Sequence, residues 1–323
     1  MIRAHKIGVI VPAYNEESLI GKTLKGIPLE VDRIVVIDDG STDNTRAVLA
    51  ENVDPRILVI QHAQNQGLGQ ALATGYRHAL AESSIDIWVV MAGDNQMDPH
   101  DLPKLVGPII DRRAMYVKGN RLFYPSVWRI MPTHRYIGNA VLTLLTKFAT
   151  GYFHLLDPQC GYTAIHRDAI QFLNLDHPHK GYGYNASLLM QLNIYNVPVV
   201  DVPVRPVYGE AISKIRLSRY IPKVSWLLFR SFVYRIIMKY IIRDFHPVGL
   251  AYLTLCGTVP VALYSGAVLF YRRVSDLSSP MDMHMLPSLM LFMLTALASL
   301  IVFLFAIWMD IEYTRSRYHW NGS

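Results

Sequence analysis

Cysteine is rare in this sequence, and nothing at its N-terminus resembles a cleavable signal peptide. Only two cysteines occur in 323 residues. Cys160 lies in the first two thirds and Cys256 in a long apolar stretch, so we expect no disulfide between them. The first six residues, Met-Ile-Arg-Ala-His-Lys, run directly into a strand-like segment. We therefore expect no secretion signal and a first domain that stays in the cytoplasm.

A strong net charge is also missing. The formal charge is +6, and the basic residues gather beside long apolar stretches. Nucleic-acid-binding domains typically carry a basic patch interleaved with stacking aromatic residues on a soluble face. This pattern is absent, so we expect no nucleic-acid partner and predict that the basic residues meet anionic lipid head groups.

Two long stretches without charge stand out near the C-terminus. Residues 248–271 and about 286–309 each contain roughly 24 uncharged residues, and at about 1.5 Å per residue such a helix exceeds the roughly 30 Å hydrocarbon core of a bilayer. A buried core helix would need protein on all its sides, so we predict two transmembrane helices.

The distribution of basic residues predicts the orientation of these helices. Before the first stretch stand Lys214, Arg216, Arg219, Lys223, Arg230, Arg235, Lys239 and Arg243, and after the second stand Arg315 and Arg317. Between the two stretches we find only Arg272 and Arg273. By the positive-inside rule, both ends of this hairpin face the cytoplasm.

Residues 34–43 read Ile-Val-Val-Ile-Asp-Asp-Gly-Ser-Thr-Asp, a short apolar run that stops abruptly at acids, glycine and hydroxyl residues. The pattern predicts a buried strand with Asp38 and Asp39 at its carboxyl end. Ligands of open α/β sheets bind outside the carboxyl ends of the strands. The alternative is an ordinary turn in which Asp39 and Ser41 cap the next helix.

Two further apolar runs end in the same way. Residues 7–11 lead into Pro-Ala-Tyr-Asn-Glu-Glu, and residues 85–91 lead into Ala-Gly-Asp-Asn-Gln-Met-Asp-Pro. Strand-like runs alternate with helical stretches over about the first 113 residues, which predicts an α/β fold with a parallel sheet and helices on its faces. Three acidic strand ends in one such sheet suggest one shared site.

A glycine pair follows the third predicted strand. The segment Asn-Gln-Gly-Leu-Gly-Gln-Ala contains Gly67 and Gly69 and resembles a phosphate cradle at a helix N-terminus. It is not a dinucleotide fingerprint, because the third glycine would fall on Leu72, and no P-loop lysine follows. Ligand contact and a turn with tight helix packing both remain open.

Together these motifs resemble family 2 glycosyltransferases. The four segments beginning at Pro12, Asp38, Asn65 and Gly93 occur in the order and spacing of that family. The resemblance implies a GT-A fold, a Rossmann-like mixed sheet with helices on both faces, followed by interfacial helices and the two transmembrane helices. We expect a cytoplasmic glycosyltransferase domain over residues 1–213, juxtamembrane amphipathic helices over 214–247, and a transmembrane hairpin with a short tail over 248–323.

With its two spans, the chain is similar to the branch that moves a sugar onto a polyprenyl phosphate, as dolichyl-phosphate mannose synthases do. The resemblance implies an inverting, metal-dependent hexosyltransferase with a UDP- or GDP-sugar donor, an undecaprenyl or dolichyl phosphate acceptor, and Mg²⁺ or Mn²⁺. Transfer to another membrane acceptor and a non-catalytic membrane scaffold are the alternatives. Whether the chain forms a homo-oligomer is left open.

The resemblance also implies roles for particular residues. Those expected to bind the nucleotide sugar are Pro12, Ala13, Tyr14, Glu16, Asp38, Asp39, Gly67 and Asp94. Asp94 would also ligate the divalent cation, with Gln96 beside it, as the second acid of the family's Asp-x-Asp motif. The first acid of that motif is replaced by Ala92, which removes a ligand or a water contact. Mg²⁺ normally uses one or two carboxylates together with substrate phosphates and water, so metal binding is still expected.

On the acceptor side, the resemblance assigns Arg121, Asp157 and Gln159 to the reaction centre. It assigns Ser213, Lys214 and Arg216 to the acceptor phosphate. Relatives usually carry an acid near Ser187 that could serve as a base, and this sequence has none there. A phosphate monoester has a second pKa of about 6 and is already mostly a dianion at pH 7, so a sugar can be transferred to it without a base. The missing acid therefore suits a phosphate acceptor.

Overall fold

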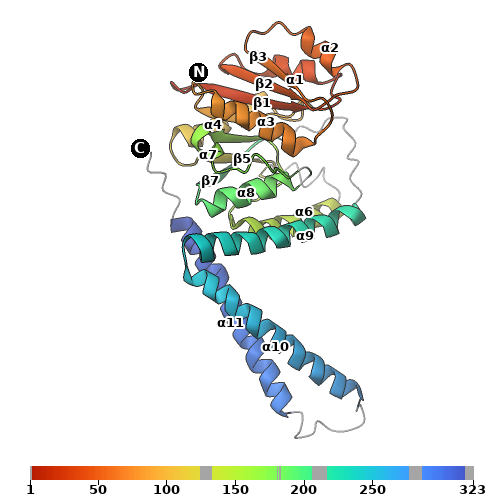
Figure 1. Ribbon diagram of the computed structural model, residues 1–323, viewed down its shortest axis with the longest axis vertical. Coiled ribbons are helices and arrows are strands. Elements are labelled where there is room, and N and C mark those ends of the chain that lie inside the picture. Colours follow the sequence, from red (N-terminus) through yellow and green to blue (C-terminus); the bar gives the residue numbers. More distant parts are fainter. Residues whose placement is uncertain are drawn as a thin grey trace. The chain divides into compact units, whose positions relative to one another are not determined.

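The computed structural model describes residues 2–123, 133–179, 181, 183–205, 217–275 and 286–316 (Figure 1). The sites predicted at Ser213, Lys214 and Arg216 lie outside these residues. The chain divides into two compact units, whose boundary falls between Val233 and Tyr234. The first unit contains the sheet, and the second contains the two long apolar helices.

The first unit is built on one mixed sheet. In the described part of the chain it has seven strands: β1 (Ile7–Ala13), β2 (Arg33–Asp38), β3 (Ile57–Gln61), β4 (Ile87–Val90), β5 (Tyr116–Asn120), β6 (Thr163–His166) and β7 (Val199–Pro203). Their order is β3-β2-β1-β4-β6-β5-β7, and only β6 runs antiparallel to its neighbours. The mixed sheet expected from the family resemblance is therefore confirmed.

Strand β6 was not predicted from the apolar pattern. It has four residues, Thr-Ala-Ile-His, and lies inside the segment that we interpreted only as an acceptor-side motif. Its reversed direction has a consequence for the site. The residues that precede Thr163 enter the sheet at the edge where the other strands end.

Helices cover both faces of this sheet (Figure 1). They are α1 (Ile20–Gly26), α2 (Thr45–Ala50), α3 (Leu68–Ala81), the short 3-10 helix η1 (Pro99–Asp101), α4 (Leu102–Ile110), α7 (Arg167–Ile170) and α8 (Tyr184–Ile194). Helix α6 (Thr133–Thr150) packs on α8. Strand side chains alternate between two apolar cores. Val9 and Val11 pack with residues of α1 and α4, whereas Ile10 packs with residues of α3 and α8. Burial on both faces explains why β1 and β2 have few polar residues.

Helix α9 (Leu217–Ile236) presents two different faces. Val224 and Leu228 are buried against Ala149 of α6 and Ala186 of α8. Trp226 and Phe229 point outward and are 67% and 57% exposed. In the first unit, the described part of α9 is thus an amphipathic helix with large apolar side chains on its open face.

The second unit holds the helices that the apolar stretches predicted. A π-helical segment, η2 (Ile237–Arg243), precedes α10 (Pro247–Ser275) and α11 (Leu286–Ser316). The most apolar stretch of 18 residues has a mean hydropathy of 1.7 in α10 and 2.7 in α11, and only 11% of each stretch is buried. Both helices are long and apolar enough to span a membrane.

A buried ion pair ties α11 to the residues that precede the first long helix. Arg235 donates to both carboxylate oxygens of Asp310, at 2.9 and 2.7 Å, and the hydroxyl of Tyr240 donates to the same carboxylate at 2.5 Å. Lys239 is also buried, with its ammonium 3.4 Å from the hydroxyl of Thr314. Arg235 and Lys239 were predicted to meet lipid head groups. Both side chains are instead buried within the second unit, which contradicts that prediction. The physical reason is that Asp310 of α11 pairs with Arg235.

Gly8 in β1 offers a test of this packing. A methyl group there would lie 2.4 Å from the indole ring of Trp88, whereas one at Gly107 in α4 would meet nothing within 4 Å. We expect Gly8→Ala to destabilise the first unit by about 1–3 kcal/mol through overpacking. Gly107→Ala should be neutral or stabilise by up to about 1 kcal/mol, since alanine favours a helix.

The measurement is the melting temperature of the purified proteins in detergent. Gly8→Ala should melt several degrees below the wild type and Gly107→Ala at or above it. Equal melting temperatures for the two variants would contradict the close packing of Trp88 on β1.

Candidate active site

The polar ends of the strands meet at one edge of the sheet. Strands β1, β2, β4, β5 and β7 all end there, and β6 begins there. The segments that follow or precede these strands carry most of the residues predicted for the site. The topology thus brings the three acidic strand ends to the same edge, as the sequence suggested.

The segments after β1 and β2 are held together by backbone-to-side-chain hydrogen bonds. The backbone N–H of Asn15 donates to the hydroxyl of Ser41 at 3.0 Å, and that of Glu16 donates to the hydroxyl of Thr45 at 2.8 Å. Asn15 has a positive φ of 57°, which asparagine tolerates better than most residues. Pro12 and Ala13 are buried, and Tyr14 is 43% exposed beside them.

Asp38 and Asp39 are both buried and both satisfied within the protein. Asp38 accepts from the backbone N–H of Ser41 at 3.0 Å and from Nε of Arg46 at 2.8 Å. Asp39 bonds to Nδ1 of His62 at 2.7 Å, and it accepts from the N–H groups of Gln66 and Gly67 at 2.9 and 2.8 Å. In this structure the two carboxylates therefore shape the loops around the edge. Their predicted contact with a nucleoside stays a prediction.

His62 is a residue of this network that the sequence analysis missed. Its other ring nitrogen, Nε2, lies 3.0 Å from the hydroxyl of Thr74 in α3, so the ring bridges β2 and α3. Its position was the available signal, because it follows the last residue of β3 directly. His62 and Asp39 together hold the loop in front of α3.

The glycine pair before α3 makes tight contacts. The N–H of Gly67, which has φ of 90°, is bound to Asp39. A methyl group at Gly69 would lie 2.0 Å from the carbonyl oxygen of His179. These contacts favour the interpretation of Gly69 as a residue required for helix packing.

Asp94 and Glu16 form the most acidic part of the edge. Burial raises the pKa of Asp94, and its carboxylate accepts from the N–H of Gln96 at 3.1 Å. Burial also raises the pKa of Glu16, and the negative charges of Asp94 and Asp43 raise it further. The two half-buried carboxylates therefore repel each other, and a cation between them would relieve that repulsion.

The residues at this point fit a hard divalent cation. Within the described ranges, no group of three or more His, Cys, Asp and Glu residues is arranged to hold a metal ion. The donors that are present, two carboxylates and the amide of Gln96, are oxygen ligands of the kind Mg²⁺ and Mn²⁺ prefer. Such a site needs substrate phosphates to complete it.

Arg121 and Asp157 form an ion pair at the end of β5. Nε and Nη2 of Arg121 donate to the two carboxylate oxygens of Asp157 at 2.9 and 3.2 Å. Burial raises the pKa of Asp157, but the charge and hydrogen bonds of Arg121 outweigh this, so the net pKa lies below the usual range. Asp157 is buried, whereas the Arg121 side chain is 41% exposed. The guanidinium is thus held in place by a carboxylate beneath it.

The other residues predicted for the acceptor side lie on the segment after Asp157 and on α8. Gln159 is half-buried, and its backbone carbonyl oxygen accepts from the side-chain amide of Asn185 in α8 at 3.5 Å. The structure thus brings Arg121 and Asp157 into contact and adds Gln159 on the same segment. Ser187 is half-buried one turn along α8, where its hydroxyl accepts from Gln191 at 3.4 Å.

The sequence analysis missed two further polar residues near the pair, Lys118 and Asp201. Asn120 donates to Asp201 of β7 at 2.6 Å, and Lys118 of β5 is buried beside the segment that carries Asp157. An acid inside the apolar run Val-Val-Asp-Val was the available signal for Asp201. An isolated acid in a strand can occur for many reasons, so the role of Asp201 is recognised only from its contact with Asn120.

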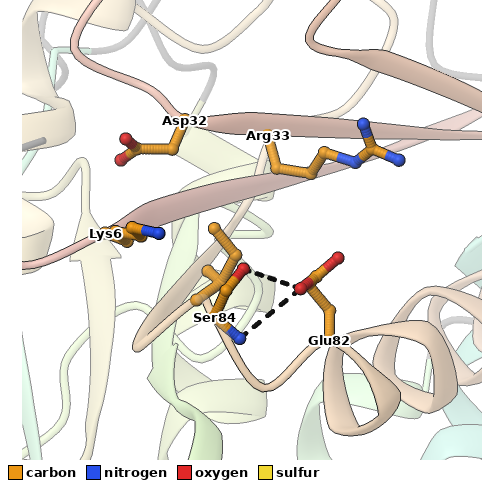
Figure 2. Close-up of a pocket in the computed structure, with 6 residues that line it drawn as sticks. Lys6, Asp32, Arg33, Glu82 and Ser84 are labelled. Carbon is orange, nitrogen blue, oxygen red and sulfur yellow. Dashed lines mark hydrogen bonds between the residues drawn. The ribbon is translucent and has the colours of Figure 1, made fainter.

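A cavity of about 390 Å³ lies at the other edge of the sheet, where the strands begin (Figure 2). It is lined by Lys6, Asp32, Arg33, Glu82, Ser84 and Ile85. Asp32 accepts from the N–H of Ile7 at 2.9 Å, and Glu82 accepts from the hydroxyl of Ser84 at 2.7 Å. None of the predicted site residues lines this cavity, so it is distinct from the acidic edge.

Comparison with known proteins agrees with the motifs and the sheet. The model of the family described as Glycosyl transferase family 2 matches residues 8–173. One relative is the UDP-N-acetylglucosamine--dolichyl-phosphate N-acetylglucosaminyltransferase of Methanococcus voltae, 31% identical over 219 residues, which cover 63% of this chain and 86% of the relative. Another is the undecaprenyl-phosphate mannosyltransferase of Micrococcus luteus, 31% identical over 206 residues, which cover 62% and 82% of the two chains.

The fold is also similar to that of a solved structure. Glucosyl-3-phosphoglycerate synthase from Mycobacterium tuberculosis, in complex with Mn²⁺, UDP and glucosyl-3-phosphoglycerate, superposes with a TM-score of 0.52 at 24% identity. The superposition covers 72% of this chain and 80% of that one. The sheet topology, the motifs at its acidic edge and the extent of the family match lead to one conclusion: the chain is a glycosyltransferase with a GT-A-like fold that belongs to glycosyl transferase family 2.

Proposed function

We propose that this protein transfers a hexose from a nucleotide sugar to a polyprenyl phosphate at the cytoplasmic face of a membrane. The observation that carries the proposal is the occurrence, in one chain, of a polar sheet edge with Asp94 and Arg121 and of two helices long enough to span a bilayer. Relatives named for transfer to dolichyl and undecaprenyl phosphate support the choice of acceptor.

The donor binds along the ends of β1, β2 and β4. Pro12, Ala13 and Tyr14 line the nucleoside, next to loops held in place by Asp38 and Asp39. Asp94 and Gln96 would hold a Mg²⁺ or Mn²⁺ ion, with Glu16 adding negative charge nearby. Such an ion neutralises the charge of the donor diphosphate. The mutual repulsion of Glu16 and Asp94 favours binding of that ion.

Arg121 stabilises the leaving diphosphate. Its guanidinium is oriented by two hydrogen bonds to Asp157 and stays partly exposed at the sheet edge. Charge that develops on a leaving group is best stabilised by donors that are already in position, since no reorganisation is then required. Gln159, on the same segment as Asp157, lies where an acceptor would approach.

The absence of an acid near Ser187 favours a phosphate as the acceptor, because a phosphate needs no base to remove a proton. A phosphate oxygen attacks the anomeric carbon from the side opposite the diphosphate, so a carbon–oxygen bond forms as the bond to the leaving oxygen breaks and the configuration inverts. The attacking dianion carries no proton that must be removed at pH 7. Ser187 and Asn185 then suffice where a hydroxyl acceptor would need an acid.

The membrane delivers this acceptor. The lipid tail stays in the bilayer while its phosphate reaches the sheet edge, helped by Ser213, Lys214 and Arg216. The exposed Trp226 and Phe229 of α9 support contact with the membrane interface, where aromatic side chains are favoured. The basic residues before α10 support the cytoplasmic orientation.

The first prediction concerns the acceptor. Protein in detergent, given radiolabelled nucleotide sugars and either polyprenyl phosphate or the matching free polyprenol, should label only the phosphate-bearing lipid. The reason is that the alcohol must lose a proton, and the described residues near Ser187 on α8 include no acid that could accept it. Equal labelling of the free alcohol, or labelling of a diacylglycerol alone, would contradict a phosphate acceptor.

The second prediction concerns the cation. Asp94→Asn removes one charge at constant size and should lower transfer about a hundredfold or more, because the donor diphosphate loses its counter-ion. Glu51→Gln, an exposed acid at the end of α2, is the matched control and should not change the rate. Chelation should abolish activity, and Mg²⁺ or Mn²⁺ should restore it. Activity that survives both treatments would rule out the metal role.

The third prediction concerns the shape of the Arg121 side chain at the leaving diphosphate. Arg121→Lys keeps the charge but loses the planar fork that Asp157 orients, so kcat should fall at least about tenfold. Arg113→Lys, an exposed ion-paired arginine, serves as the control. Wild-type kcat in Arg121→Lys would show that charge alone is sufficient.

A further inference from the structure

Lys118 is a basic residue that is buried inside the first unit. It lies in the middle of β5, is 1% exposed, and its burial lowers the pKa of its ammonium group. A buried lysine is costly unless it is compensated, and a methionine or leucine would fill the same volume at lower cost. Its presence therefore requires a reason in its contacts.

The ammonium group of Lys118 donates a hydrogen bond to the backbone carbonyl oxygen of Cys160. Two residues further along, the carbonyl oxygen of Tyr162 accepts from the N–H of Gly119 at 2.8 Å. Cys160 in turn donates its own N–H to the carbonyl oxygen of Asp157 at 3.3 Å. The segment of residues 157–162, which leads into β6, is thus attached to β5 at two successive points.

Two acids compensate the buried charge without pairing directly with it. Asp157 and Asp201 both stabilise the ammonium of Lys118 through their charges, and Asp201 lies opposite Lys118 in the register of β5 and β7. Asp157 is already bonded to Arg121, and Asp201 to Asn120 and to the N–H of Leu156. Lys118 is therefore not needed to satisfy either carboxylate. Its hydrogen bond serves the loop.

We infer that Lys118 is a positioning residue for sugar transfer, which holds the segment bearing Asp157 and Gln159 against β5 through the carbonyl of Cys160. The inference rests on the proposed function for its consequence, because that segment carries the partner of Arg121 and the acceptor-side glutamine. Displacing it would turn the Arg121 guanidinium away from the leaving group. The bond is charge-assisted and thus about twice as strong as a neutral one.

Three variants test this role. Lys118→Met keeps the volume and removes the donor, Lys118→Gln keeps a neutral donor, and Lys25→Met on the exposed surface of α1 is the control. We expect kcat per nucleotide-binding site to fall at least about tenfold in Lys118→Met, with the KM for the donor within about twofold of wild type. Lys118→Gln should recover at least threefold over Lys118→Met, and Lys25→Met should match the wild type.

A second measurement does not depend on catalysis. Hydrogen exchange of a peptide covering residues 157–162 should be faster in Lys118→Met than in the wild type and unchanged in Lys25→Met. Wild-type kcat and exchange in Lys118→Met, or a Gln variant no better than the Met variant, would overturn the inference. An inactive wild type with the expected change in exchange would remove the proposed function, and the attachment of the segment by Lys118 would stand.

Discussion

The carboxylate of Asp39 organises the loops at the ends of β2 and β3 through three hydrogen bonds. They reach the ring of His62 and the backbone N–H groups of Gln66 and Gly67, which lie in front of α3. A buried carboxylate is tolerable only when its oxygens are satisfied, so the loop and the acid stabilise each other. The position of α3 relative to β2, and with it one wall of the candidate site, depends on this arrangement.

Charge is distributed unevenly along the same sheet edge. Glu16 and Asp94 repel each other near the ends of β1 and β4, whereas Arg121 and the buried Lys118 supply positive charge near β5. In the proposed function, the anionic donor binds at the acidic end together with a cation, and Arg121 stabilises its leaving diphosphate. The same proposal assigns the two phosphate-containing substrates to one site in which the described residues near Ser187 include no acid.

The strands and their acidic ends could be predicted from local sequence because hydrophobic periodicity and turn chemistry are local properties. The runs before Pro12, Asp38 and Asp94 indicated both the strands and the shared edge. Strand β6 escaped prediction because its four residues begin with threonine and end with histidine, so they form no continuous apolar run like that of β4. Arg235 was assigned to the lipid surface because its partner, Asp310, is distant in sequence and the pattern contains no sign of their contact.

By itself, then, the sequence determined the class of sheet, the two long apolar helices and the family to which the chain belongs, since these follow from short motifs and from composition. Only the tertiary structure decided which charges are paired. His62, Lys118 and Asp201 acquire their roles from neighbours on other strands, and the energetic cost of a buried charge depends entirely on those neighbours. Contacts between residues far apart along the chain arise only when the sheet has formed.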